Sequence, residues 1–284
     1  LLLLLHLYIG WRIVPQLPGA VAGFAFAALL LASALLIPLG FFGRRAARRE
    51  VADRWTWAGM LSLGLFSMLL VLTLLRDALL LVTLPLELPA LTQHSAAAVP
   101  LLGLAAAVAG FASARRTPRV REVELPIEGL PAALQGFTIA QISDLRVGPT
   151  VKAAYVRAVV ERVNGLQADA VAITGDLVDG RVRDLAHDVA ALAGLRSRHG
   201  SFFVTGNHEY YSGAADWVAL LRRLGLTVLI DEHVVIEHDG ARLVLAGVAD
   251  ASARHFEPRH RSDPQAALAG APHGDLVADL HAAG

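Results

Sequence analysis

The feature that most constrains this chain is an uninterrupted apolar stretch near its start. The stretch Leu17–Phe42 contains no charged side chain. An α-helix rises about 1.5 Å per residue, so this length exceeds the roughly 20 residues that cross the hydrocarbon core of a bilayer. The mean hydropathy of the whole chain, +0.52, is also high for an ordinary soluble domain. We therefore expect part of the protein to lie in a membrane.

Further apolar segments follow the first. We predict a second span over Trp55–Leu75, whose leading tryptophans are typical of an interfacial aromatic belt, and a third over Ala96–Ala114. Leu1–Ile9 is apolar as well and predicts the tail of another span. A cleavable signal peptide does not explain this pattern, because more hydrophobic segments follow and no small-residue cleavage site precedes a soluble start. We expect three to four spans within residues 1–121 and a second domain over residues 122–284.

Arginine placement predicts the orientation of these spans. The loop between the first two spans holds five arginines, the segment after the last span holds four, and residues 78–95 hold no Lys or Arg. The two clusters are Arg44, Arg45, Arg48, Arg49 and Arg54, and Arg115, Arg116, Arg119 and Arg121. By the positive-inside rule both face the cytoplasm. This favours a multi-pass protein of a bacterial-type inner membrane, with its second domain in the cytoplasm.

Few ionisable residues lie within the spans. Arg76 and Asp77 fall at the predicted end of the second span, where they form either an intramembrane ion site or an ion pair at the interface. The scarcity of other charges there argues against a transporter. The chain begins with Leu1 and stops abruptly at Gly284, so we interpret it as a fragment truncated at both ends.

Charge and cysteine content narrow the function of the second domain. The chain has 25 Lys and Arg and 25 Asp and Glu, but residues 1–121 hold 11 basic and 4 acidic groups, so the remainder is acidic. An acidic domain argues against nucleic acid as a partner, because phosphate-backbone binding needs a basic surface. No cysteine is present. Any metal site must therefore use carboxylate, imidazole and amide ligands.

Strand and helix patterns alternate after residue 136. Short β-rich segments are predicted at 137–143, 170–174 and 201–205, each followed by a helical pattern, at 151–164, 182–195 and 214–224. Two further strands, 234–237 and 242–247, flank the turn His238-Asp239-Gly240. Strands that alternate with helices predict an α/β fold with a largely parallel sheet, whose ligands bind at the carboxyl ends of the strands.

Each of the first three predicted strands ends in polar residues. Asp144 follows the first, Asp176 the second, and Asn207 with His208 the third. Taken singly, each residue could cap a helix or form a turn. Together they predict one edge that gathers two carboxylates, an amide and an imidazole. Such groups suit a pair of divalent ions that activates water against a phosphate ester, with the imidazole protonating the leaving oxygen.

Three motifs resemble the calcineurin-like metallophosphoesterase superfamily, in particular its membrane-attached bacterial branch. They are Ile-Ser-Asp144-Leu-Arg-Val-Gly, Thr-Gly-Asp176-Leu-Val-Asp179-Gly and Val-Thr-Gly-Asn207-His208-Glu209-Tyr-Tyr. The resemblance covers about Leu125–Asp250 and implies a four-layered α/β/β/α sandwich with two divalent ions of the Mn, Fe, Zn or Mg class. It implies that Asp176 bridges the ions, that Asp144 binds one and Asn207 the other, and that His208 acts on the substrate.

The sequence departs from the family pattern in two ways. Arg146 stands where the family has a metal-binding His. A guanidinium cannot ligate a metal, so we expect Arg146 to bind a substrate phosphate or to occupy part of the first metal's place, leaving a weakened or mononuclear site. The family's later His and Gly-His-x-His ligands do not occur before Gly284. The tail of the chain contains four histidines, His255, His260, His273 and His281. His281 lies roughly where the family has its later metal-binding His, but its spacing and neighbouring residues match the family pattern poorly.

Two functions remain from the sequence. The first is a membrane-anchored, metal-dependent phosphoesterase that hydrolyses a phosphate ester or pyrophosphate, with membrane lipid and a lipid-linked phosphate as partners. The alternative is a catalytically inactive membrane-bound homologue that serves as a scaffold or ligand-binding module, because Arg146 has replaced a ligand. Tyr210 and Tyr211 either stack on a substrate group or pack against the domain.

Overall fold

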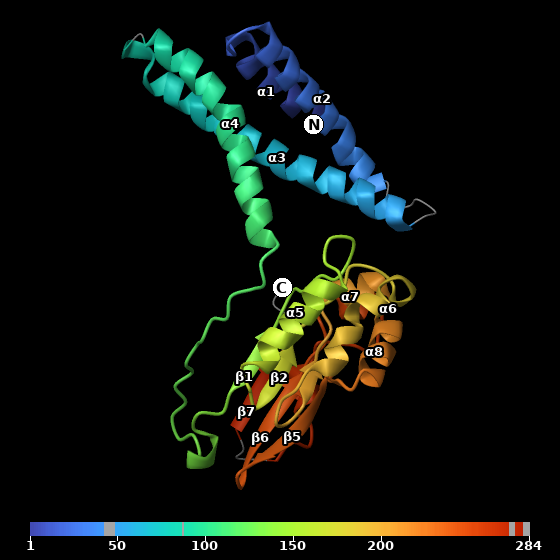
Figure 1. Ribbon diagram of the computed structural model, residues 1–284. Helices are drawn as coiled ribbons and strands as arrows, with labels where there is room; N and C mark the ends of the chain where they lie inside the picture. Colours follow the sequence, from blue (N-terminus) through green and yellow to red (C-terminus); the bar gives the residue numbers. More distant parts are fainter. Residues whose placement is uncertain (43–48, 87, 273–275, 281–284) are drawn as a thin grey trace. The chain divides into compact units, whose positions relative to one another are not determined.

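The computed structural model describes residues 1–42, 49–86, 88–272 and 276–280 (Figure 1). It divides into two compact units, Leu1–Arg116 and Thr117–Gly284. The first unit is built of apolar helices and the second of strands alternating with helices. The predicted fold class, transmembrane-type helices followed by an α/β domain with a parallel sheet, is confirmed.

The first unit contains four α-helices. They are α1 (Leu2–Ile13), α2 (Ala20–Phe42), α3 (Arg49–Val82) and α4 (Pro89–Ala114), with short 3₁₀ turns η1 (Val14–Gln16) and η3 (Leu84–Leu86). Three of the helices in the described ranges, α2, α3 and α4, are long and apolar enough to cross a membrane. Helices α3 and α4 contain the second and third predicted spans, and α2 covers the first from Ala20 onward. Arg44, Arg45 and Arg48 of the first arginine cluster lie outside the described residues.

Helices α2 and α3 approach each other closely at two glycines. A Cβ atom on Gly40 would lie 2.7 Å from the Cα atom of Gly59, and one on Gly59 would lie 2.6 Å from the Cα atom of Gly40. Neither position therefore has room for a side chain. Small residues at a helix crossing let the backbones approach, which is how helices pack when lipid removes the hydrophobic drive for association.

A cluster of polar side chains joins α1, α3 and α4. Asp77 accepts a hydrogen bond from the Tyr8 hydroxyl at 2.6 Å and forms an ion pair with Arg12, 2.7 Å from its Nη2 atom. Arg76 is buried and donates to the Ser95 hydroxyl at 3.0 Å. Helix α3 continues past Asp77 only as far as Val82, so the position of this pair relative to the end of the span stays a prediction. Arg76 and Asp77 form an ion pair at 3.6 Å and also connect neighbouring helices of the bundle.

Replacing Asp77 with Asn is expected to lower the thermal stability of the helical unit. The variant removes the carboxylate that pairs with Arg12, and hydrogen bonds to charged groups contribute about 1.5–3 kcal/mol each. Thermal unfolding in detergent measures the effect. Glu50→Gln, an exposed change at the start of the same helix, is the matched control and should unfold like wild type. Equal midpoints for Asp77→Asn and the control would contradict the structural role of this carboxylate.

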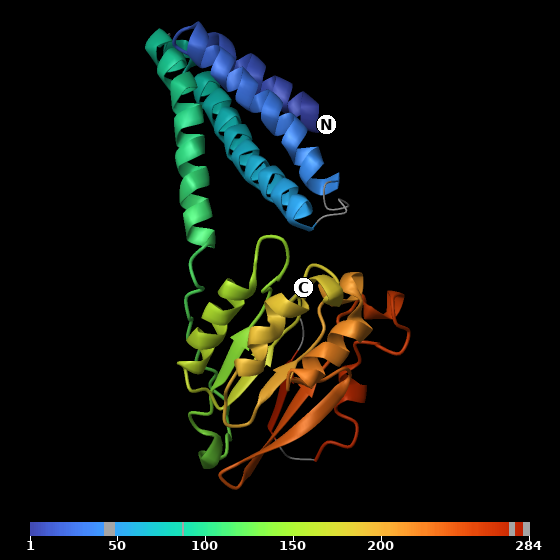
Figure 2. The ribbon, with the colours of Figure 1, turned by 45° about the vertical axis from the view of Figure 1, so that its right-hand side comes forward.

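The second unit is built on a four-stranded parallel sheet. Strands β1 (Ile139–Ile142), β2 (Ala170–Ile173), β3 (Ser201–Phe203) and β4 (Thr227–Val228) lie in that order. Helices α5 (Ala153–Asn164), α6 (Val182–Val189) and α8 (Ala214–Arg223) connect the strands and cover one face (Figure 2). The chain after α6 tightens into the 3₁₀ turn η5 (Ala190–Gly194), so the predicted helix 182–195 exists in two parts.

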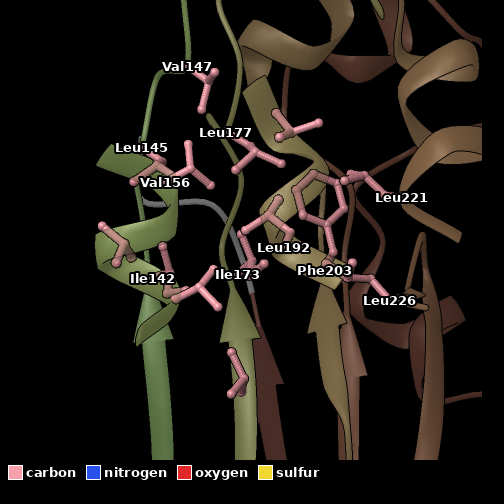
Figure 3. Packing of buried hydrophobic residues seen from close by; sticks show 14 of the residues in the cluster. Ile142, Leu145, Val147, Val156, Ile173, Leu177, Leu192, Phe203, Leu221 and Leu226 are labelled. Carbon is pink, nitrogen blue, oxygen red and sulfur yellow. The ribbon is translucent and has the colours of Figure 1, made fainter. Parts of the chain in front are cut away.

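The two central strands of this sheet, β2 and β3, are buried on both faces. Val171, Ile173 and Phe203 point to the side of the helices and pack with Val156 and Leu192 there (Figure 3). The alternate residues of the same strands face a second sheet; they are Ala170, Ala172 and Phe202. Burial on both sides is why these strands read as continuous apolar runs in the sequence.

The second sheet has three strands. Strands β5 (Glu232–His238) and β6 (Ala241–Gly247) form an antiparallel hairpin, and β7 (Leu276–Leu280) pairs parallel to β6. Asp239 and Gly240 at the hairpin tip have φ angles of 49° and 87°, as a tight two-residue turn requires. The short helix α9 (Pro264–Ala267) contacts β5 and β6. The four predicted layers are therefore present. They are the helices α5, α6 and α8, the parallel sheet, the three-stranded sheet, and α9, which is a single helical turn in the described part of the chain.

Candidate active site

The loops after β1 and β2 run side by side at the carboxyl edge of the parallel sheet. The backbone N–H of Arg146 donates to the carbonyl of Asp176 at 3.1 Å, and that of Val147 donates to the carbonyl of Leu177 at 2.8 Å. The N–H of Asp179 returns a hydrogen bond to the carbonyl of Val147 at 2.8 Å. The parallel pairing therefore continues past the strand ends, which brings the first two predicted motifs together.

Two glycines bring the third motif against the second. A Cβ atom on Gly175 would lie 2.8 Å from the Cα atom of Gly206, and one on Gly206 would lie 2.5 Å from the backbone nitrogen of Asp176. Gly175 also has a φ of 82°, which side-chain-bearing residues rarely adopt. The Gly-Asp and Gly-Asn-His motifs contain glycine because their backbones touch here.

Three other residues of this edge also adopt left-handed backbone angles. The φ values are 54° for Asp144, 47° for Arg146 and 51° for Asp176. Non-glycine residues in this region are uncommon and carry a conformational cost, and they cluster at functional sites. The hydrogen bonds between the two loops hold these angles in place.

Arg146 lies at the centre of the site. Its Nη2 atom is 2.5 Å from an oxygen of Asp176 and 3.2 Å from an oxygen of Asp144. Its Nη1 atom contacts the Nε2 atom of His208. The Asp176 side chain is only 9% exposed, whereas that of Arg146 is 43% exposed. The guanidinium thus supplies the positive charge that the buried carboxylate of Asp176 requires, and it also pairs with the half-exposed carboxylate of Asp144.

The contact with Arg146 fixes the protonation pattern of His208. A guanidinium can only donate, so Nε2 of His208 must be the acceptor and Nδ1 must carry the ring hydrogen. Nδ1 lies 3.8 Å from the carboxylate of Asp179, which favours this tautomer. The backbone N–H of His208 donates to Asp176 at 3.1 Å. These contacts place the imidazole against Arg146 and Asp179, with the His208 backbone bound to Asp176.

Asn207 provides the observation that fits a metal ion. Its Oδ1 atom is buried, and within the described part of the chain no hydrogen-bond donor reaches it. An unpartnered buried oxygen is costly unless something else binds it. The other side of the site does not fit an ion, because the Arg146 cation lies between Asp144 and Asp176. Among the described residues, no three His, Asp or Glu side chains form a metal-binding group.

Glu209 supports the site, a role that the sequence interpretation missed. Its carboxylate is fully buried and accepts hydrogen bonds from backbone N–H groups of two loops. The donors are Gly206 at 2.7 Å, Asp176 at 3.0 Å, Leu177 at 2.9 Å and Val178 at 3.2 Å. Burial raises its pKa to about 7, while the donated N–H groups of Gly206, Asp176 and Val178 act in the opposite direction. The available signal was an acidic residue three positions after Gly206, the spacing of a capping box.

The two tyrosines after the motif have different environments. Tyr210 is buried and its hydroxyl contacts Thr205 at 3.0 Å and Nδ1 of His260 at 2.7 Å. Burial raises the pKa of Tyr210 to about 12. It is therefore a packing residue. Tyr211 is 62% exposed and stands edge-on to the His208 ring, with 5.6 Å between the centroids.

The histidines of the tail do not complete a metal site in the described residues. His260 bonds to Tyr210, and His255 bonds to the carbonyl of Ser252 at 3.1 Å. His273 and His281 lie outside the described residues. His281, whose spacing and neighbours match a replacement ligand poorly, is therefore not tested by the structure.

The comparisons with known proteins identify this domain. Residues 137–267 match the family model described as calcineurin-like phosphoesterase. This range contains all three motifs and all four strands of the parallel sheet. The domain belongs to the calcineurin-like phosphoesterase family. The parallel sheet and the motif order of this phosphoesterase domain agree with the resemblance inferred from the sequence.

Relatives of the phosphoesterase domain occur in animals and bacteria. "Transmembrane protein with metallophosphoesterase domain" of Danio rerio is 37% identical over 169 residues, 58% of this chain and 39% of that protein. The Bos taurus protein of the same name is 40% identical over 172 residues, 57% of this chain and 38% of that protein. A metallophosphoesterase of Helicobacter pylori is 34% identical over 174 residues, 57% of this chain and 45% of that protein. The chain spans about two fifths of the length of these animal relatives, and the similarity is not restricted to a bacterial branch.

Proposed function

We propose that this chain is a membrane-anchored, metal-dependent phosphoesterase that hydrolyses a phosphate ester or pyrophosphate. The observation that carries the proposal is the meeting of Asp144, Asp176 and His208 at one edge of the sheet, beside the unpartnered oxygen of Asn207. Asp176 and Asn207 are the residues that would hold a divalent ion. Such an ion polarises a phosphoryl oxygen and makes hydroxide available near neutral pH.

The remaining residues of the edge bind and orient the substrate. Arg146 presents a half-exposed guanidinium, whose planar donors suit a phosphate group. A phosphate oxygen that replaces His208 as acceptor for Arg146 releases the Nε2 atom of that imidazole. The freed imidazole can then hold a proton for the leaving oxygen, while Asp179 keeps the ring oriented through Nδ1.

The surroundings of His208 favour a substrate with an anionic and an apolar part. Tyr211 lies 5.4 Å from Phe256, ring centroid to centroid, and both rings are more than half exposed. The segment that carries Phe256 also lines a surface hollow with Arg254, His255 and Arg261. Aromatic and cationic side chains together suit a lipid-linked phosphate or pyrophosphate.

The helical unit supports a membrane location for this activity. Three helices of the described chain have the length and composition of membrane spans, and animal relatives are named transmembrane proteins. The arginine clusters favour a cytoplasmic phosphoesterase domain in a bacterial-type inner membrane. The substrate would then be reached at the cytoplasmic leaflet.

Removing metal is expected to remove the activity. The full chain in detergent, supplied with Mn²⁺, should hydrolyse a chromogenic phosphodiester at least about tenfold faster than after treatment with EDTA, and added Mn²⁺ should restore the rate. A lipid-linked pyrophosphate in the same assay tests the finer substrate assignment. Rates that are equal with Mn²⁺ and with EDTA, for both substrates, would contradict the enzyme assignment.

One observation favours the alternative of an inactive homologue. Arg146 engages both predicted metal-binding carboxylates and the Nε2 atom through which His208 would act. A homologue whose carboxylates and imidazole are occupied by Arg146 would retain the fold and bind phosphate groups without cleaving them. Binding of the phosphodiester with no turnover in the Mn²⁺ assay is the result that this alternative predicts.

A further inference from the structure

The carboxylate of Asp176 needs a positive partner, and the half-exposed carboxylate of Asp144 lies on the other side of the same guanidinium. The backbones of these two aspartates are held together by the loop pairing, and the Asp176 side chain is only 9% exposed, so solvent screens it little. A buried carboxylate without a partner is strongly destabilising. In a two-metal site of this family the charge would come from ions, as the resemblance implies. In this chain it comes from Arg146.

The contacts of Arg146 are those expected of an internal cation. One nitrogen, Nη2, reaches an oxygen of each carboxylate, at 2.5 Å from Asp176 and 3.2 Å from Asp144. The other, Nη1, contacts Nε2 of His208. The left-handed φ of 47° at Arg146 aims the residue back over the site from the loop after β1. A metal ion bound by both carboxylates would have to occupy the space that the guanidinium fills.

The opposite side of the site lacks such a cation. Nothing in the described chain donates a hydrogen bond to the buried Oδ1 atom of Asn207. The second oxygen of Asp176, Oδ1, faces the third motif, where it accepts the backbone N–H of His208 at 3.1 Å. The carboxylates of Asp144 and Asp176 therefore have a positive partner in Arg146, whereas the buried oxygen of Asn207 has no partner among the described residues.

From this asymmetry we infer that the guanidinium of Arg146 takes the place of the first metal ion, so that this edge binds at most one divalent ion, on the Asn207 side. The inference rests on the metal-binding edge of the proposed function and makes it more specific. The fixed cation cannot generate hydroxide, because it has no open coordination position. It leaves phosphate binding to the guanidinium and any activation of water to the single ion.

Counting bound metal tests this inference without measuring activity. We would equilibrate the full chain in detergent with Mn²⁺, remove free ions, and measure metal by mass spectrometry and electron paramagnetic resonance. Wild type should hold at most one ion at this edge and show the six-line signal of an isolated Mn²⁺. Arg146→His should hold one more ion per chain and, when two are bound, show a spin-coupled signal.

A matched control separates the site from a general effect of adding histidine. Arg157→His introduces the same side chain at an exposed position of α5 and should bind as many ions as wild type. Equal metal content in wild type and Arg146→His would overturn the inference. If the variant does not fold, the wild-type measurement still decides, because a spin-coupled pair of ions in wild type would also overturn it.

The outcome is independent of catalysis. A gain of one ion in Arg146→His with no hydrolysis by either protein would support the inference while the proposed function fails. Metal-dependent hydrolysis by a wild-type chain that holds two coupled ions would do the reverse.

Discussion

Asp176→Asn should reduce metal-dependent hydrolysis by a factor of about 10²–10³, the scale of losing one preorganised electrostatic contact. Asp176 accepts a hydrogen bond from Arg146 with one carboxylate oxygen and from the backbone N–H of His208 with the other. Asparagine keeps the size of the side chain and one acceptor oxygen but removes the charge that a cation needs. The steady-state rate on a phosphodiester with Mn²⁺ measures the effect.

The control for this experiment is another aspartate that lies outside the site. Asp184 on α6 has a half-exposed side chain that forms an ion pair with Arg183 at 3.6 Å, and exposed ion pairs contribute little. Asp184→Asn should therefore retain the wild-type rate and unfolding midpoint. An Asp176→Asn variant that folds like wild type and keeps its rate would remove Asp176 from the reaction.

Glu209→Gln should destabilise the phosphoesterase domain by about 2–6 kcal/mol, because two buried backbone donors left without an acceptor cost about 1–3 kcal/mol each. Each carboxylate oxygen of Glu209 accepts two backbone N–H groups. Glutamine has the same shape, but its amide nitrogen would face two of these donors and leave them without an acceptor. A loss of this size should lower the unfolding midpoint by on the order of 10 °C for a domain of this length.

Thermal unfolding followed by tryptophan fluorescence measures this change, because Trp217 is fully buried in the same domain. Glu161→Gln on the exposed face of α5 makes the same chemical substitution where no buried donors depend on it. A Glu209→Gln variant as stable as Glu161→Gln would mean that the four hydrogen bonds do not hold the loops together.

Much of the fold followed from local patterns. The strand before Asp144, the strand before Asp176 and the hairpin around Asp239 were each predicted within a few residues of their observed bounds. These elements are readable because burial on both faces produces apolar runs, and because a tight turn demands particular residues. The long helices were readable for a similar reason, since their length and lack of charge leave few alternatives.

Other features were invisible in the sequence because they depend on residues far apart in the chain. The pairing of Asp77 with Arg12 joins residues 65 positions apart. The addition of β7 to β6 likewise joins two strands that residues 248–275 separate in the chain. Glu209 looked like one more polar residue in a loop, because only the folded backbone brings four N–H donors to it.

The sequence by itself determined that a membrane-type helical unit precedes an α/β domain and that carboxylate, amide and imidazole groups share one sheet edge. It also showed that Arg146 replaces a ligand, but it left open whether this side chain meets a substrate or fills a metal's place. The folded chain adds the position of the guanidinium between Asp144 and Asp176, which the pairing of the loops after β1 and β2 produces, and on this position rests our inference that Arg146 takes the place of a metal ion. A motif fixes which groups are available, whereas the distances between charges arise only when the loops pack together.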